Sequence, residues 1–181
     1  PKTVVEYMGE QHPMASMPGA QADTLIDSVS QITSFIMEQQ FTNENPNYPS
    51  FSALPQPLCS YYGSSSNREN LLRAARQKIA SPSAAIRNGE AILMGLKLWE
   101  DGRINTEHSP YARSLKTKLA AKGGMVLNRD EILEIFYAAT NEYISTDFHI
   151  EADLEMLVMA AMAQQGEIEI VLNGGNRINA S

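Results

Sequence analysis

The chain has a single cysteine, Cys59, so no disulfide can form within it. This sparing use of cysteine is typical of a reducing compartment. No run of about 18 apolar residues is present, which excludes a helix that spans a membrane. No apolar stretch follows the first charged residues, as a secretory signal peptide requires. We therefore expect a cytoplasmic or virion protein that makes no contact with membranes and is not secreted through a signal peptide.

Catalytic and cofactor motifs are absent as well. Neither the G-x-x-x-x-G-K-[ST] loop nor the G-x-G-x-x-G loop of nucleotide-binding proteins occurs. His12, His108 and His149 do not have the spacing of metal ligands. Ser109 follows His108 but is better explained as a helix N-cap, and Cys59 has no neighbouring base to lower the pKa of its thiol. The sequence predicts no catalytic residue, metal site, cofactor or enzyme activity.

The charges that are present are sorted along the chain. Residues 68–129 hold twelve Lys/Arg against five Asp/Glu, a net charge of +7. Residues 1–67 carry −5 and residues 130–181 carry −9. A basic segment between acidic ends indicates either a polyanion bound at the middle or contacts between copies of the chain. The plainer alternative is that solvated helix faces happen to be sorted in this way.

Within the basic segment, we expect five residues to contact a polyanion, most simply RNA phosphate. Arginine suits this role because its guanidinium binds two phosphate oxygens at once. Only two aromatic residues, Trp99 and Tyr111, lie in the segment, so contacts should be to the backbone and independent of base sequence. The five expected nucleic-acid-binding residues are Arg68, Arg73, Arg76, Arg113 and Lys116.

Helix-start signals recur along the chain. Ser66 and Glu69 have the spacing of a capping box. Ser81-Pro82 and Ser109-Pro110 each combine an N-cap with proline at the first helical position. Alternating residues from Glu167 predict a strand, paired either with residues 176–179 or with the N-terminus. The predicted helices span about residues 20–41, 66–80, 82–99, 110–122, 128–143 and 147–164.

These signals predict a mainly α protein, a single helical-bundle-like domain of five or six helices with a short terminal hairpin or two-stranded sheet. The predicted parts are an N-terminal arm (1–19), a first helix (20–41), a Pro/Ser-rich arm (42–66), a helical core (67–166) and a C-terminal strand and tail (167–181). The Pro/Ser-rich arm carries apolar side chains that we expect to dock on a neighbouring subunit, with docking on its own domain as the alternative. These expected subunit contacts are Tyr48, Phe51, Leu54, Leu58, Tyr61 and Tyr62.

Three functions fit this pattern. The first is a self-assembling structural subunit that coats nucleic acid non-specifically, as a coat or nucleocapsid-like protein does, with copies of itself and RNA as partners. The second is a non-catalytic accessory subunit of a multi-subunit enzyme. The third is a helical DNA-binding regulator, which ranks last because the gap from Trp99 to Ser109 is longer than the turn of a helix-turn-helix.

Overall fold

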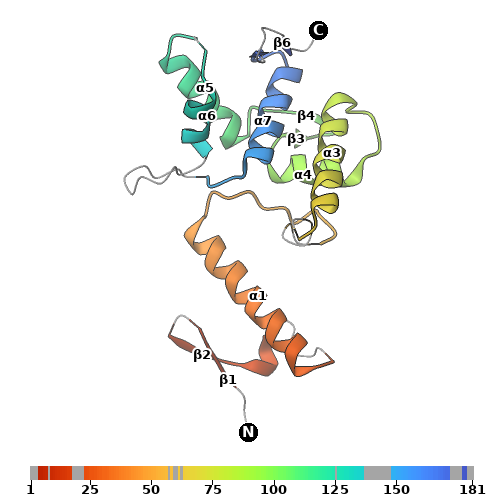
Figure 1. Cartoon of the computed structure of the whole chain (residues 1–181), viewed down its shortest axis with the longest axis vertical. Helices are drawn as coiled ribbons and strands as arrows, with labels where there is room; N and C mark the ends of the chain where they lie inside the picture. Colours follow the sequence, from red (N-terminus) through yellow and green to blue (C-terminus); the bar gives the residue numbers. More distant parts are fainter. Residues whose placement is uncertain are drawn as a thin grey trace. The chain divides into compact units, whose positions relative to one another are not determined.

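The structure is a computed structural model that describes residues 4–7, 9–17, 23–56, 58, 61, 63–124, 126–136, 148–171 and 177–178. Among these residues it has six α-helices, a 3-10 helix and three two-stranded sheets. The predicted mainly helical class with small sheets is confirmed. The chain divides into two compact units, Pro1–Pro46 (unit 1) and Asn47–Ser181 (unit 2) (Figure 1).

Unit 1 pairs a hairpin with one long helix. Val4 lies opposite Pro13 and Tyr7 opposite Glu10 in the antiparallel pair. Its elements are β1 (Val4–Tyr7), β2 (Glu10–Pro13), the 3-10 helix η1 (Met14–Ser16) and α1 (Leu25–Glu44). The predicted N-terminal arm is therefore largely a hairpin. The helix begins at Leu25 because the Thr24 side chain caps it, accepting a hydrogen bond from the Asp27 amide at 3.1 Å.

Unit 2 contains the other helices and two short hairpins. The predicted C-terminal hairpin is confirmed, with Ile170 opposite Ile178. In chain order its elements are α3 (Ser65–Ala80), α4 (Arg87–Gly95), β3 (Trp99–Glu100), β4 (Arg103–Ile104), α5 (Pro110–Ala121), α6 (Arg129–Phe136), α7 (Ala152–Gln164), β5 (Ile170–Val171) and β6 (Arg177–Ile178).

The predicted helix from residue 82 to 99 is wrong in both bounds. Residues 81–86 form turns, and α4 begins only at Arg87. After α4, the chain turns into the β3–β4 hairpin through Asp101 and Gly102, both at positive φ (51° and 76°). Asp-Gly is the preferred pair for such a two-residue hairpin turn. The apolar residues that suggested a longer helix are instead shared between a helix and a strand.

Local capping chemistry confirms two other predicted helix starts. The Ser109 hydroxyl accepts a hydrogen bond from the Ala112 amide at 3.4 Å, with Pro110 in the first turn of α5. Asn128 and Glu131 exchange hydrogen bonds of 2.9 and 3.0 Å at the start of α6. At Ser66, in contrast, the helix has already begun, because α3 starts at Ser65 with Ser64 as its N-cap.

The core of unit 2 lies where α7 meets α3 and α5, with α4 packed on α3. α7 is apolar on nearly every side, as is typical of a helix buried at the centre of a fold. Gly89 lets α3 and α4 approach closely, since a Cβ there would lie 2.3 Å from the Ala74 carbonyl oxygen. The largest fully buried side chains are Ile92, Leu93, Leu96, Leu98, Ile150, Leu154, Leu157, Val158 and Met162.

Candidate functional site

The five basic residues predicted to bind a polyanion are distributed over α3 and α5, and most of them contact groups of their own unit. Arg68 forms an ion pair with Asp153, Arg76 with Glu69, and Lys116 with Glu167 at 2.7 Å. Arg73 donates a hydrogen bond to the Asn70 side chain. Arg113 is exposed and forms no ion pair with a described residue. The structure does not bring the five together as one continuous basic face.

In the folded chain, residues of the basic segment form ion pairs with residues of the acidic C-terminal region. Two of these ion pairs join the basic segment to the acidic C-terminal region over 85 and 51 residues, Arg68 to Asp153 and Lys116 to Glu167. A third, Lys122 to Glu131 at 2.6 Å, joins α5 to α6. The Lys122 hydrogen bond is the main cause that lowers the pKa of the Glu131 carboxyl. Much of the positive charge in residues 68–129 is therefore neutralised within unit 2.

Lys78 is a basic residue of α3 that is almost fully buried. Its Nζ donates to the Ala84 carbonyl at 2.8 Å and lies 3.3 Å from a Glu90 carboxylate oxygen. The ammonium also lies 4.2 Å from the centre of the Trp99 ring. These three partners come from the α3–α4 turn, α4 and β3. Lys78 thus holds the α3–α4 region together and is not available to a ligand.

The predicted subunit contacts pack on their own unit. Leu54 belongs to the buried core cluster, and Tyr48, Phe51, Leu58 and Tyr61 lie partly buried against it. The Tyr48 hydroxyl donates to the Glu151 carboxylate at 2.9 Å. This packing favours the alternative, docking on their own domain, and the expected contact with another subunit stays a prediction. Tyr62 lies outside the described residues.

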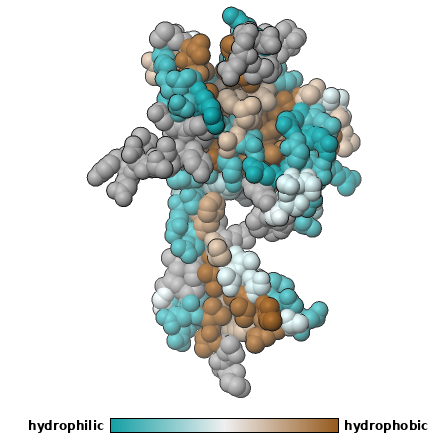
Figure 2. Space-filling view, viewed as in Figure 1, coloured by the Kyte–Doolittle hydropathy of each residue, from teal (hydrophilic) through white to brown (hydrophobic). Residues whose placement is uncertain are grey.

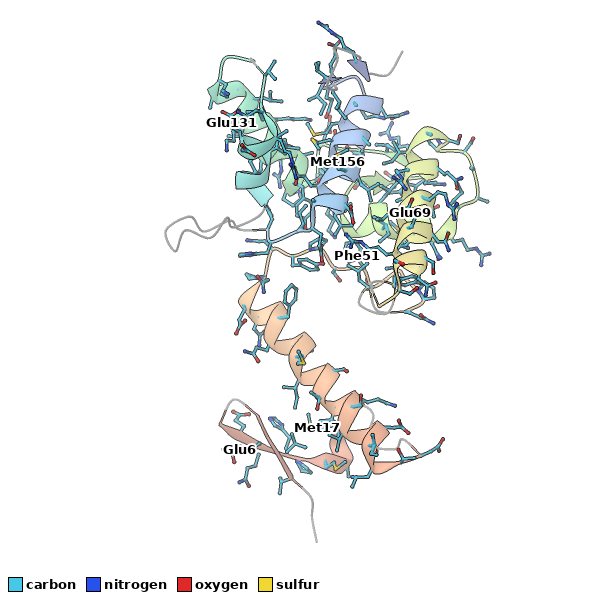
Figure 3. All side chains as sticks on the ribbon, in the orientation of Figure 1. Glu6, Met17, Phe51, Glu69, Glu131 and Met156 are labelled. Atoms are coloured by element: carbon cyan, nitrogen blue, oxygen red, sulfur yellow. The ribbon has the colours of Figure 1, made fainter. Side chains whose placement is uncertain are left out.

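The segment of residues 47–61, hereafter the strap, carries these apolar side chains. It approaches the helices closely at Gly95, the last residue of α4. A Cβ at Gly95 would lie 2.3 Å from Cδ1 of Phe51 and 2.9 Å from the Ser50 carbonyl oxygen. Phe51 is labelled in Figure 3. From α5, the Tyr111 hydroxyl donates to the Asn47 carbonyl at 3.0 Å. The strap therefore contacts α4 through the Phe51 ring and the Ser50 backbone, and α5 through the Asn47 carbonyl.

Among the described acids of unit 2, Glu155 on α7 is the one that is almost fully buried. It is only 4% exposed, and its buried Oε2 has no hydrogen-bond partner among the described residues. Burial raises the pKa of this carboxyl from 4.5 to about 7, although the charge of Arg129 acts in the opposite direction. Acids in the first turn of a helix are usually solvated, but Glu155 is buried. In the sequence, only the apolar residues beside Glu155 along α7 indicated that this carboxyl would be buried.

The histidine and serine candidates have structural surroundings. His108 Nδ1 lies 2.7 Å from Glu100 Oε2, which also accepts from Asn105 at 2.8 Å, at an exposed site beside the β3–β4 hairpin. Ser109 is buried and donates to the Leu96 carbonyl at 2.9 Å, so its hydroxyl does not face His108 as a nucleophile would. No group of three His, Cys, Asp or Glu side chains in the described part of the chain is placed to hold a metal ion.

Unit 1 exposes apolar side chains on α1. Leu25, Ile26, Val29 and Met37, hereafter the α1 stripe, are 71%, 81%, 52% and 65% exposed. Val29 lies three positions after Ile26, and Met37 lies eleven positions after Ile26. These spacings place the three side chains along one side of the helix. Ile32, three residues after Val29, is buried, as is Met17 after the hairpin. Met17 is labelled in Figure 3. Hydrophobic surface is gathered over unit 1 in Figure 2.

None of the helices that the structure describes is both long and apolar enough to cross a membrane. No curated protein and no solved structure matches the chain significantly. Residues 68–181, more than half of the chain, match the family described as "Family of unknown function (DUF6079) 4th domain". The match begins within α3 and includes the whole core of α4, α5 and α7, but not the strap or unit 1. The chain therefore belongs to this family of unknown function, of which it carries the fourth domain.

Proposed function

We propose that this chain is a non-catalytic assembly domain that binds a partner protein through the α1 stripe of unit 1. The observation that carries the proposal is the exposure of four large apolar side chains on one helix. Single exposed apolar residues are ordinary, but a set of them along a helix is typical of an interface. The proposal develops the accessory-subunit reading of the sequence.

Two further features support an assembly role. The described residues of unit 1 bury only Met17, Ser28 and Ile32, so this unit has little core of its own. A two-stranded hairpin and a single helix gain stability mainly by packing against something else. The family description, a fourth domain, also fits a chain that works beside other domains.

Site-specific photocrosslinking in the native host tests this proposal. A photoreactive residue at position 26 or 37 should form adducts with a partner protein, because both positions face the bound molecule. The same residue at Met94 or Met156, which are exposed in unit 2, should not. Equal adducts from all four positions, or adducts from none, would contradict an interface on α1.

A second candidate function, binding of nucleic acid by a coat-like subunit, is favoured by one observation. Arg87, Lys97, Arg103 and Arg113 are exposed, and none of them forms an ion pair with a described residue. If they contact RNA phosphates, affinity should fall with salt at a slope of about −0.7 per contact. Arg113→Glu should flatten this slope for every RNA sequence alike. Absence of RNA binding at low salt would remove the coat-like function.

A further inference from the structure

The charge of unit 1 constrains what covers the α1 stripe. Residues 1–46 contain one basic residue, Lys2, against six acids, and no Lys or Arg occurs from residue 3 to residue 67. Asp27 and Glu44 are exposed acids of α1 itself. The stripe is therefore an apolar surface with acidic residues on the same helix and no basic residue to balance them.

A second copy of unit 1 is a poor occupant of this surface. Two copies that met through the α1 stripe would bring two units of net charge −5 together. Like charges across an interface oppose association and slow the encounter of the two surfaces. A partner with basic residues beside its apolar side chains would gain from both features of the stripe.

Resting on the proposed function, we infer that the partner presents a basic amphipathic helix to the α1 stripe. Helices dock on apolar surfaces through side chains at positions i, i+3, i+4 and i+7. In such a partner, Lys and Arg that flank the apolar positions would lie near Asp27 and Glu44. Electrostatic complementarity of this kind selects partners and raises the rate of association more than it raises affinity.

Fluorescence anisotropy with designed peptides and the full chain tests the inference. The probe is an 18-residue helix with Leu at i, i+3, i+4 and i+7 and Lys at the remaining positions. A second peptide has Glu in place of every Lys, and a third has the residues of the first in scrambled order. The Lys peptide should bind at least about tenfold more tightly than the other two, a difference of about 1.4 kcal/mol.

Variants locate the binding site. Ile26→Gln with Met37→Gln should weaken binding of the Lys peptide about tenfold, because both apolar side chains are lost. Met94→Gln with Met156→Gln changes two exposed apolar residues of unit 2 to Gln and should leave binding unchanged. Glu44→Gln should weaken binding about twofold and reduce its dependence on salt. If the unit 2 variant weakens binding as much as the α1 variant, the inference is wrong.

The outcomes separate the inference from the function on which it rests. Equal binding of the Lys and Glu peptides through the stripe would overturn the basic partner and leave an assembly surface in place. Equal binding of the scrambled peptide would show attraction by net charge alone, which also overturns the inference. A dimer of the chain that dissociates in the Ile26→Gln, Met37→Gln variant would identify a second copy as the occupant. No peptide binding and a monomeric chain would overturn both proposals.

Discussion

At the scale of the residue, the buried carboxyl of Glu155 should make the stability of unit 2 depend on pH. Its folded-state pKa is about 7, above its ordinary value of 4.5. Below pH 4.5 the carboxyl is protonated in both states, and its contribution to stability is fully present. As pH rises toward 7 the unfolded state loses the proton first, so the free energy of unfolding falls, by up to about 3 kcal/mol.

Glu155→Gln should remove this pH dependence, because the amide cannot ionise. The variant should match the wild type near pH 4 and exceed its stability at pH 8, as measured by urea unfolding across this range. Glu107→Gln, which changes an exposed carboxyl, serves as the control and should follow the wild type. A Glu155→Gln variant that loses stability in parallel with the wild type would show that the carboxyl is not the cause.

Gly95→Ala tests the close approach between α4 and the strap. The added methyl group would meet the Phe51 ring, and such overpacking costs about 1–3 kcal/mol. Trimming the ring with Phe51→Ala should relieve part of this cost, giving a coupling of about 1 kcal/mol in a double-mutant cycle by thermal or urea unfolding.

Gly89→Ala is the matched control for that cycle. There the added methyl group meets the backbone carbonyl of Ala74, so Phe51→Ala should not rescue it. Additive effects of Gly95→Ala and Phe51→Ala would mean that the two residues do not meet as the structure has them.

At the scale of elements, we expect the strap to contribute to the stability of unit 2, because its apolar side chains pack on the core. Deleting residues 47–61 removes Leu54 from the core and uncovers apolar residues of the cluster. We expect a lower melting temperature and binding of a hydrophobic dye. Tyr48→Phe, which removes the hydroxyl that donates to Glu151, should cost about 1–2 kcal/mol. Deletion without change in the melting temperature would show that the strap does not belong to the folded core.

Some elements follow from the sequence because their causes are local. Ser109-Pro110 and Asn128 to Glu131 begin helices as predicted, since an N-cap acts within one turn. The β3–β4 hairpin was missed, although Asp101-Gly102 carried a recognisable turn signal. Three features were not predictable from the sequence: the surface on which the strap docks, the burial of Glu155, and the partners of Arg68 and Lys116. Each depends on residues 51 or more positions away, or on packing that periodicity along one segment does not report.

At the scale of the whole molecule, the division at Pro46 predicts that unit 2 folds alone. A chain of residues 47–181 keeps the strap, the core and the ion pairs. We expect its melting temperature to lie within about 2 °C of that of the full chain, because the core is intact. In the full chain, amides of α1 should exchange hydrogen faster than those of α7, since unit 1 buries few side chains. Failure of residues 47–181 to fold would contradict the division.

The ion pairs across unit 2 also bear on how the chain is made. Synthesis runs from the N-terminus, so the +7 segment is made before Asp153 and Glu167, the acids that pair with Arg68 and Lys116. During that interval the nascent chain carries exposed cations beside ribosomal RNA, an abundant polyanion. The two long-range ion pairs can therefore form only late in synthesis, once the acidic C-terminal region has been made.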